Sequence, residues 1–169
     1  STSLGDAANP TTFERRQNNS IMYDSPNFSG FSARVQVSTP QTTIGLSSNA
    51  TIGKPRVWGL GVNYTNGPLI DLASFEQHTN FATLNGGGSQ KGTTDTGYQL
   101  GAAYQFGPVK AGAIYTRRNY DSGCNVQTAV CSAGDASVNA YGVNIDWTIQ
   151  GPHELKVAYA HANSTSGGF

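Results

Sequence analysis

Large apolar residues recur at every second position in several stretches of the chain. In the stretch 58–64, WGLGVNY, four apolar residues alternate with two glycines and an asparagine. Such alternation is typical of a β-strand with one apolar and one polar face. The same pattern recurs in stretches 98–106, 109–115, 141–149 and 155–159. Since helical periodicity is absent, the pattern predicts five clear strands.

Three weaker stretches, 19–25, 31–39 and 69–77, bring the expected number of strands to about eight. The connections between them alternate in length. Short ones, rich in Pro, Gly and Asn, fall at 25–30, 65–68, 106–108 and 150–153, and long polar ones at 40–55, 78–94 and 117–136. An up-and-down meander has this alternation when all its short turns share one end, as in outer-membrane β-barrels.

We therefore expect an all-β fold, a transmembrane antiparallel up-and-down β-barrel. A soluble β-sandwich is the alternative, because its strands also alternate. Strands of about 9–11 residues match a tilted membrane crossing, and four successive short turns at one end are unusual for Greek-key connections. Both observations favour the barrel.

Composition agrees with this interpretation and excludes other classes. The 169 residues are 37% hydrophobic and only 12% charged, with 21 glycines, and no apolar run is long enough for a transmembrane helix. The formal net charge is zero, so the chain lacks the basic footprint of a nucleic-acid-binding protein. Because composition does not shift along the chain, residues 1–169 are expected to form one unit.

The positions between the apolar residues are small or polar, and they would leave the interior of a closed eight-stranded barrel hollow. A wider barrel with a water-filled lumen removes this difficulty. Such a barrel needs about sixteen strands, more than this chain can supply. We therefore expect the chain to be a segment of a longer protein. We expect this segment to end, at Phe169, within a loop of that protein.

By the same alternation, several charged side chains are expected to point into the lumen. The basic ones are Arg16, Arg34, Lys110, Arg118 and Lys156, and the acidic ones are Asp24, Asp71 and Asp146. A slight basic excess would favour anions, although each residue taken singly could equally be a solvated wall charge. Arg16 is the best candidate for a role at a constriction, because it precedes its strand and follows the polar start of the chain.

Aromatic residues are expected to form two interfacial girdles on the apolar face. Tyr23, Tyr64, Phe106 and Trp147 come near the short turns, and Phe75, Tyr98 and Tyr115 come nearer the long connections.

Cys124 and Cys131 lie close together in a polar stretch without further Cys or His residues. This favours a disulfide that closes a small loop, over a metal site. Three histidines, His78, His153 and His161, are expected in a loop, a short turn and a strand end, and no Gly-x-Ser-x-Gly elbow is present. We therefore expect no enzyme, no metal and no cofactor.

The segment RRQNNSIMYDSPNFSGF at 15–31 resembles the strand and turn that follow the constriction loop in general porins of Gram-negative bacteria, of the beta-proteobacterial type. The segments YQLGAAYQFGP at 98–108 and YGVNIDW at 141–147 are similar to later strands of that family. The resemblance implies a sixteen-stranded trimeric barrel in the outer membrane, narrowed by an inward-folded third loop. It also implies that residues 1–13 end that loop, that residues 14–165 form about eight strands, and that Arg16 faces the loop.

The expected function is passive diffusion of ions and small hydrophilic solutes through a water-filled channel with weak anion preference. The expected partners are outer-membrane lipid, lipopolysaccharide and two further copies of the chain. The alternative is a barrel that acts as an adhesin or binding protein through its long loops, which conductance measurements would distinguish.

Overall fold

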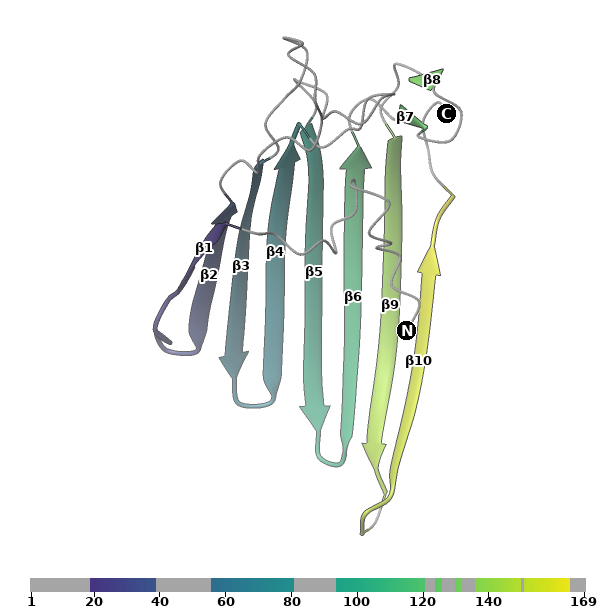
Figure 1. Cartoon of the computed structure of the whole chain (residues 1–169). Helices are drawn as coiled ribbons and strands as arrows, with labels where there is room; N and C mark the ends of the chain where they lie inside the picture. The colour runs from purple at the N-terminus through teal and green to yellow at the C-terminus, as the bar shows by residue number, and fades with distance from the viewer. Residues whose placement is uncertain are drawn as a thin grey trace.

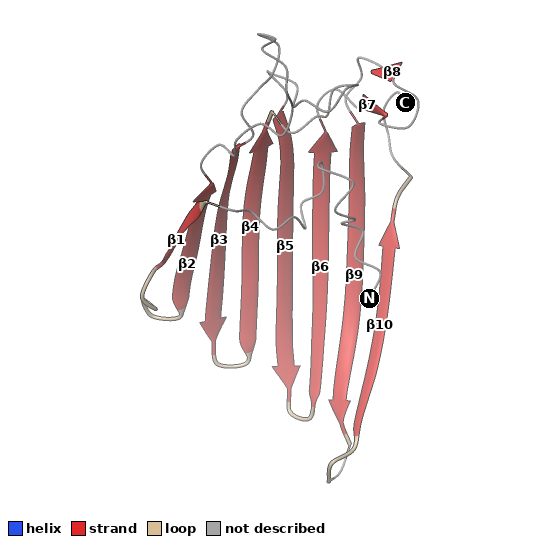
Figure 2. Ribbon diagram, viewed as in Figure 1, coloured by secondary structure: helices blue, strands red, loops and turns tan. Residues whose placement is uncertain are grey.

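The computed structural model of the chain describes residues 19–38, 56–80, 94–120, 124–125, 130–131, 136–149 and 151–164. Figure 2 shows that the regular structure in these ranges consists of strands. No helix in the described ranges is long and apolar enough to cross a membrane. The strands are β1 (Ser20–Asp24), β2 (Phe31–Ser38), β3 (Arg56–Asn66), β4 (Leu69–Thr79), β5 (Thr94–Phe106), β6 (Val109–Tyr120), β7 (Cys124–Asn125), β8 (Val130–Cys131), β9 (Ala136–Thr148) and β10 (Glu154–Ala162).

Eight of these strands form one antiparallel sheet in the order β1-β2-β3-β4-β5-β6-β9-β10. Each long strand therefore lies beside its neighbour in the sequence, and the short turns gather at one end of the sheet (Figure 1). The short strands β7 and β8, which lie between β6 and β9 in the sequence, form a separate two-stranded sheet. This is the predicted meander, and the sheet remains open rather than closing into a barrel.

Several strands are longer than the alternation predicts, mainly at the ends away from the short turns. Strand β5 begins at Thr94 rather than at Tyr98, and β6 continues to Tyr120. His78, expected in a loop, lies in β4, paired with Val57 and Asp95. The loop prediction for His78 was therefore wrong, because polar residues continue the backbone ladder beyond the last large apolar side chain.

Two faces follow from the strand register. The residues paired across neighbouring strands form rows, and all members of a row project to the same side. One row contains Val35, Leu60, Phe75 and Tyr98, and the next contains Arg34, Gly61, Ser74, Gln99 and Thr116. We call the side of the first row the apolar face and the side of the second the polar face.

Little of the sheet is buried. Among the described residues, Val57 is the buried hydrophobic one, whereas Leu100 is 57% exposed and Phe106 is 60% exposed. No second layer covers the described apolar face, as one would in a β-sandwich. An uncovered apolar surface of this extent marks a membrane or protein contact, and the hydrocarbon of a bilayer suits it.

The short turns step progressively along the sheet. The β3–β4 turn closes at the row of Asn66 and Leu69, and the β5–β6 turn closes two rows further, at Phe106 and Val109. The β9–β10 turn closes beyond these, past the pair of Thr148 and Glu154. This stagger matches the tilted, sheared strands of a barrel wall.

The turn between β1 and β2 fits closely against the end of β3. Gly30 has a φ of +93°, and a Cβ placed on it would overlap the carbonyl oxygen of Thr65. The Thr65 amide in turn donates a hydrogen bond of 2.9 Å to the Gly30 carbonyl. Glycine is required here by both backbone conformation and space.

Candidate functional site

The polar face is less hollow than its small residues suggest. Leu72 lies over Gly101 and Ile114 lies over Gly142, each within 3.2 Å of the position that a Cβ on the glycine would take. These two apolar side chains belong to the polar face, where the alternation predicted small or polar residues. Their neighbouring glycines make room for them, so this row is filled by cross-strand packing.

The open part of the polar face lies nearer the long connections. A Cβ on Gly61 would meet no atom within 4 Å, and one on Gly59 would meet only ordinary contacts. Together with Gly97 these residues help to line a depression of about 450 Å³. We call this depression the glycine hollow.

Polar side chains from four strands surround the glycine hollow. They come from two adjacent polar-face positions on β2, β4, β5 and β6, while β3 contributes the glycines. The polar lining residues are Arg34, Gln36, Ser74, Glu76, Gln99, Thr116 and Arg118. Leu60, Phe75 and Tyr98 of the same strands complete the lining. The hollow therefore offers hydrogen-bonding groups together with acidic and basic side chains.

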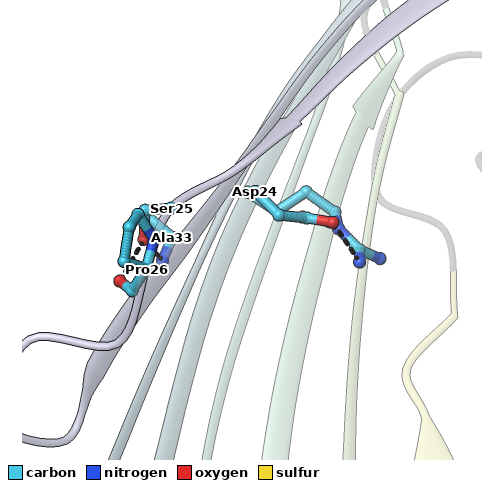
Figure 3. A network of polar contacts seen from close by, with 5 residues as sticks. Asp24, Ser25, Pro26 and Ala33 are labelled. Atoms are coloured by element: carbon cyan, nitrogen blue, oxygen red, sulfur yellow. Dashed lines mark hydrogen bonds and ion pairs between the residues drawn. The ribbon is translucent and has the colours of Figure 1, made fainter.

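Arg34, at the edge of the hollow, is held by an acid on the neighbouring strand. Its Nε donates to Asp24 Oδ1 at 2.5 Å, and its terminal nitrogen donates to Asp24 Oδ2 at 2.9 Å. Figure 3 shows the polar contact of Asp24 with the neighbouring side chain, near the hydrogen bonds of Ser25. Bidentate geometry fixes the plane of the guanidinium, although both side chains are more than half exposed.

A second charged group lies near the short turns. Lys110, Asp146 and Lys156 are paired across β6, β9 and β10 and therefore form one row of the polar face. Lys156 also forms an ion pair of 3.1 Å with Glu154, two residues earlier on the same strand. Acids and bases thus alternate along this part of the wall.

The structure brings most of the predicted lumen residues to one side. The register places six of them on the polar face: Arg34, Lys110, Arg118, Lys156, Asp24 and Asp146. Arg16 lies outside the described residues. The position of Asp71 differs from the prediction.

Asp71 lies on the apolar face, between Tyr64 on β3 and Ala102 on β5. The sequence suggested the opposite, because Ile70 and Leu72 on either side of it are apolar. The two-residue turn at Gly67 and Pro68 decides the register, and it sets Phe75 opposite Leu60. A register shift of one residue would send every side chain of β4 to the other face, so the rest of the strand overrides this local pattern.

Sequence reasoning missed several acids of the polar face. Glu76 contacts His78 at 2.5 Å, and Asp95, paired with His78, is buried. With Glu154, Asp24 and Asp146, they make five acids on the described polar face against four basic residues. The described wall therefore has no basic excess. Strict application of the alternation to β4 and to the start of β5 would have found Glu76 and Asp95.

The seven residues predicted as girdle aromatics all lie on the apolar face: Tyr23, Tyr64, Phe106, Trp147, Phe75, Tyr98 and Tyr115. Trp58, Phe75 and Tyr98 form a line of rings across three strands, with centroid separations of 4.9 and 5.7 Å. The rings are tilted against one another, and such aromatic pairs contribute large apolar contact area.

The polar tips of these aromatics have partners near the long connections. Trp58 Nε1 donates to Gln77 at 2.9 Å, Tyr115 donates to Asn139 at 2.9 Å, and Asn119 donates to the Tyr98 hydroxyl at 3.0 Å. Tyrosine and tryptophan with such polar neighbours are typical of the boundary between lipid tails and water. This edge of the apolar face therefore fits a membrane interface.

The two cysteines lie opposite each other in the backbone ladder of β7 and β8. This pairing is consistent with the predicted disulfide, which stays a prediction. No cluster of three or more metal-ligating side chains occurs in the part of the chain that the structure describes.

Comparison with known proteins agrees with this wall. Residues 1–168 match the family described as Gram-negative porin. The chain belongs to the Gram-negative porin family. Membership of this family places the chain in the outer membrane. The family points to a channel rather than an enzyme.

Two curated relatives extend the comparison. The chain is 28% identical over 136 residues to an outer membrane porin protein of Bordetella pertussis, across 76% of this chain and 35% of the relative. It is 30% identical over 147 residues to outer membrane porin protein 32 of Delftia acidovorans, across 86% of this chain and 36% of the relative. The chain thus matches about a third of the length of these porins.

Two adjacent residues of β9 provide a matched test of the two faces. Val143 lies on the apolar face and Asn144 on the polar face. In the full-length porin, Val143→Arg is expected to lower the free energy of unfolding from lipid by about 2–4 kcal/mol, because a cation would face hydrocarbon. Asn144→Arg is expected to lower it by less than about 1 kcal/mol, since its side chain lies on the water-accessible face.

Denaturant titration of each variant refolded into lipid vesicles measures both values. Equal costs for the two substitutions would contradict the assignment of the faces.

Proposed function

We propose that the full-length protein forms a water-filled channel for passive diffusion of ions and small hydrophilic solutes. The observation that carries the proposal is the polar face, with its small residues, paired charges and open glycine hollow, behind a face that suits hydrocarbon. A wall of this kind keeps water in contact with one side of every strand. A solute can therefore cross while it stays hydrated.

The mechanism needs no covalent step. Groups such as Gln99, Ser74 and Thr116 can replace part of the hydration shell of a passing solute by short-lived hydrogen bonds. The charged pairs add a local field without strong net attraction. A solute that binds weakly at several points of a wall can enter and leave quickly.

Selectivity in the proposed channel depends on how the charges are paired. Asp24 neutralises Arg34, and Glu154 neutralises Lys156, so these residues contribute little net field at a distance. The predicted weak anion preference therefore depends on basic residues beyond these pairs. Arg16 is the candidate that the family resemblance indicates, opposite an inward-folded loop.

The assembly that we propose is a homotrimer in contact with outer-membrane lipid and lipopolysaccharide. The open eight-stranded sheet leaves β1 and β10 each with an unpaired edge, which further strands of a full-length porin would pair. The homotrimer is what the family resemblance implies. The aromatic and polar edge of the apolar face suits the head groups of an outer leaflet.

Planar-bilayer recording of the full-length protein tests the channel. We expect steady ohmic conductance, and a smaller conductance for Gly61→Phe, because the new side chain would project into open space above the hollow. Ala102→Phe, on the apolar face, serves as the matched control and should leave conductance at the wild-type value. A protein without ion conductance would contradict the channel and favour the binding or adhesin barrel.

The pair of Asp24 and Arg34 gives a test of charge. Arg34→Gln leaves the Asp24 carboxylate without its cation and is expected to move the reversal potential in a salt gradient toward cation preference. Asp24→Asn is expected to move it toward anion preference, most strongly at low ionic strength. The double variant should return close to the wild-type value, since the pair carries no net charge. A shift of the same sign in both single variants would contradict this account of the wall.

A further inference from the structure

The apolar face carries one acid that the channel does not use. Asp71 is half-buried, two residues from the start of β4, and therefore about 7 Å along the strand from the short turn. It forms no hydrogen bond or ion pair with any other described residue. A carboxylate at the edge of hydrocarbon without a countercharge from the protein is costly, and it favours a cation supplied from outside.

A groove of about 810 Å³ begins beside this carboxylate. Three alanines with small side chains, Ala73, Ala102 and Ala113, line it on β4, β5 and β6, and we call it the alanine groove. Ala102 is paired directly with both Asp71 and Ala113, so the depression is continuous with the carboxylate. Tyr115 and Tyr141 line its other end.

Two aromatic rings lie at the Asp71 end of the groove. Phe31 and Tyr64 stack with centroids 4.2 Å apart, and Tyr64 is paired with Asp71 across β3 and β4. Ring faces attract cations, and they do so most strongly where water is partly excluded. A carboxylate and two rings together match a primary ammonium group, which can donate hydrogen bonds to the acid and approach the rings closely.

We propose that Asp71 and the alanine groove form a binding site for one lipid whose head group carries a primary ammonium, such as phosphatidylethanolamine. The ammonium pairs with the Asp71 carboxylate at the membrane boundary, and an acyl chain fills the groove over the alanines. Charge complementarity selects the head group. Because the groove lies on the lipid-facing side, an acyl chain of the same lipid can reach it. The site depends on the outer-membrane location and would remain if the protein did not conduct.

Native mass spectrometry of the full-length protein in detergent tests the site. Phosphatidylethanolamine and phosphatidylglycerol with identical acyl chains are added in competition. We expect the wild type to retain the ethanolamine lipid about two- to fivefold better, which is the effect of a partly exposed ion pair. Asp71→Asn should abolish this preference, while Asp146→Asn, an acid of the polar face, should leave it unchanged.

A second variant distinguishes the contribution of the acyl chain from that of the head group. Ala102→Phe fills the groove and is expected to reduce retention of both lipids. Equal retention of the two lipids by the wild type, or a preference that survives Asp71→Asn, would overturn the proposal. If Asp71→Asn does not fold, competition between phosphatidylethanolamine and its trimethylated analogue on the wild type decides, because the site requires the unmethylated ammonium to bind better.

Discussion

The structure depends on one constraint. No second layer covers the described sheet, so one of its faces must suit hydrocarbon and the other must suit water. Inside a membrane every backbone N–H and C=O needs a partner within the protein, and the antiparallel ladder from β1 to β10 provides it for the interior strands. The side chains are then divided by the pleat, so that Leu100 meets one surrounding and Gln99 the other. Burial in a dry core, which stabilises most soluble proteins, has almost no role in the described part of this chain.

The same constraint explains which features could be predicted from the sequence. Alternation and turn residues predicted the eight-stranded meander correctly, because both are local properties of the chain. Asp71 shows where local pattern fails. Its neighbours Ile70 and Leu72 are apolar and suggest one register, but the turn at Gly67 and the contacts of Phe75 impose the other. The filling of Gly101 by Leu72 was equally hidden, since it requires the partner across the strand to be known. The strand positions of His78 and Asp95 were missed because polar strand ends look like loops.

The charged residues show that the electrostatic field at the polar face cannot be predicted from the charge of each residue taken singly. Counting predicted lumen residues gave a basic excess, whereas the register brings Asp24 to Arg34 and Glu154 to Lys156. Such exposed pairs contribute little to stability, but they remove net charge from the surface that a solute meets. Function in this wall therefore depends on which charges are paired, and this requires strand register as well as composition.

The division of the sheet into two faces can be measured directly in the full-length porin in lipid. Nitroxide labels are placed singly at Val143, Asn144, Ile145 and Asp146 of β9, with Cys124 and Cys131 replaced by serine, and relaxation by oxygen is compared with relaxation by a water-soluble nickel chelate. The account predicts alternation, with oxygen dominating at Val143 and Ile145 and the chelate dominating at Asn144 and Asp146. Uniform accessibility along the four positions, or dominance of the chelate at Val143 and Ile145, would contradict it.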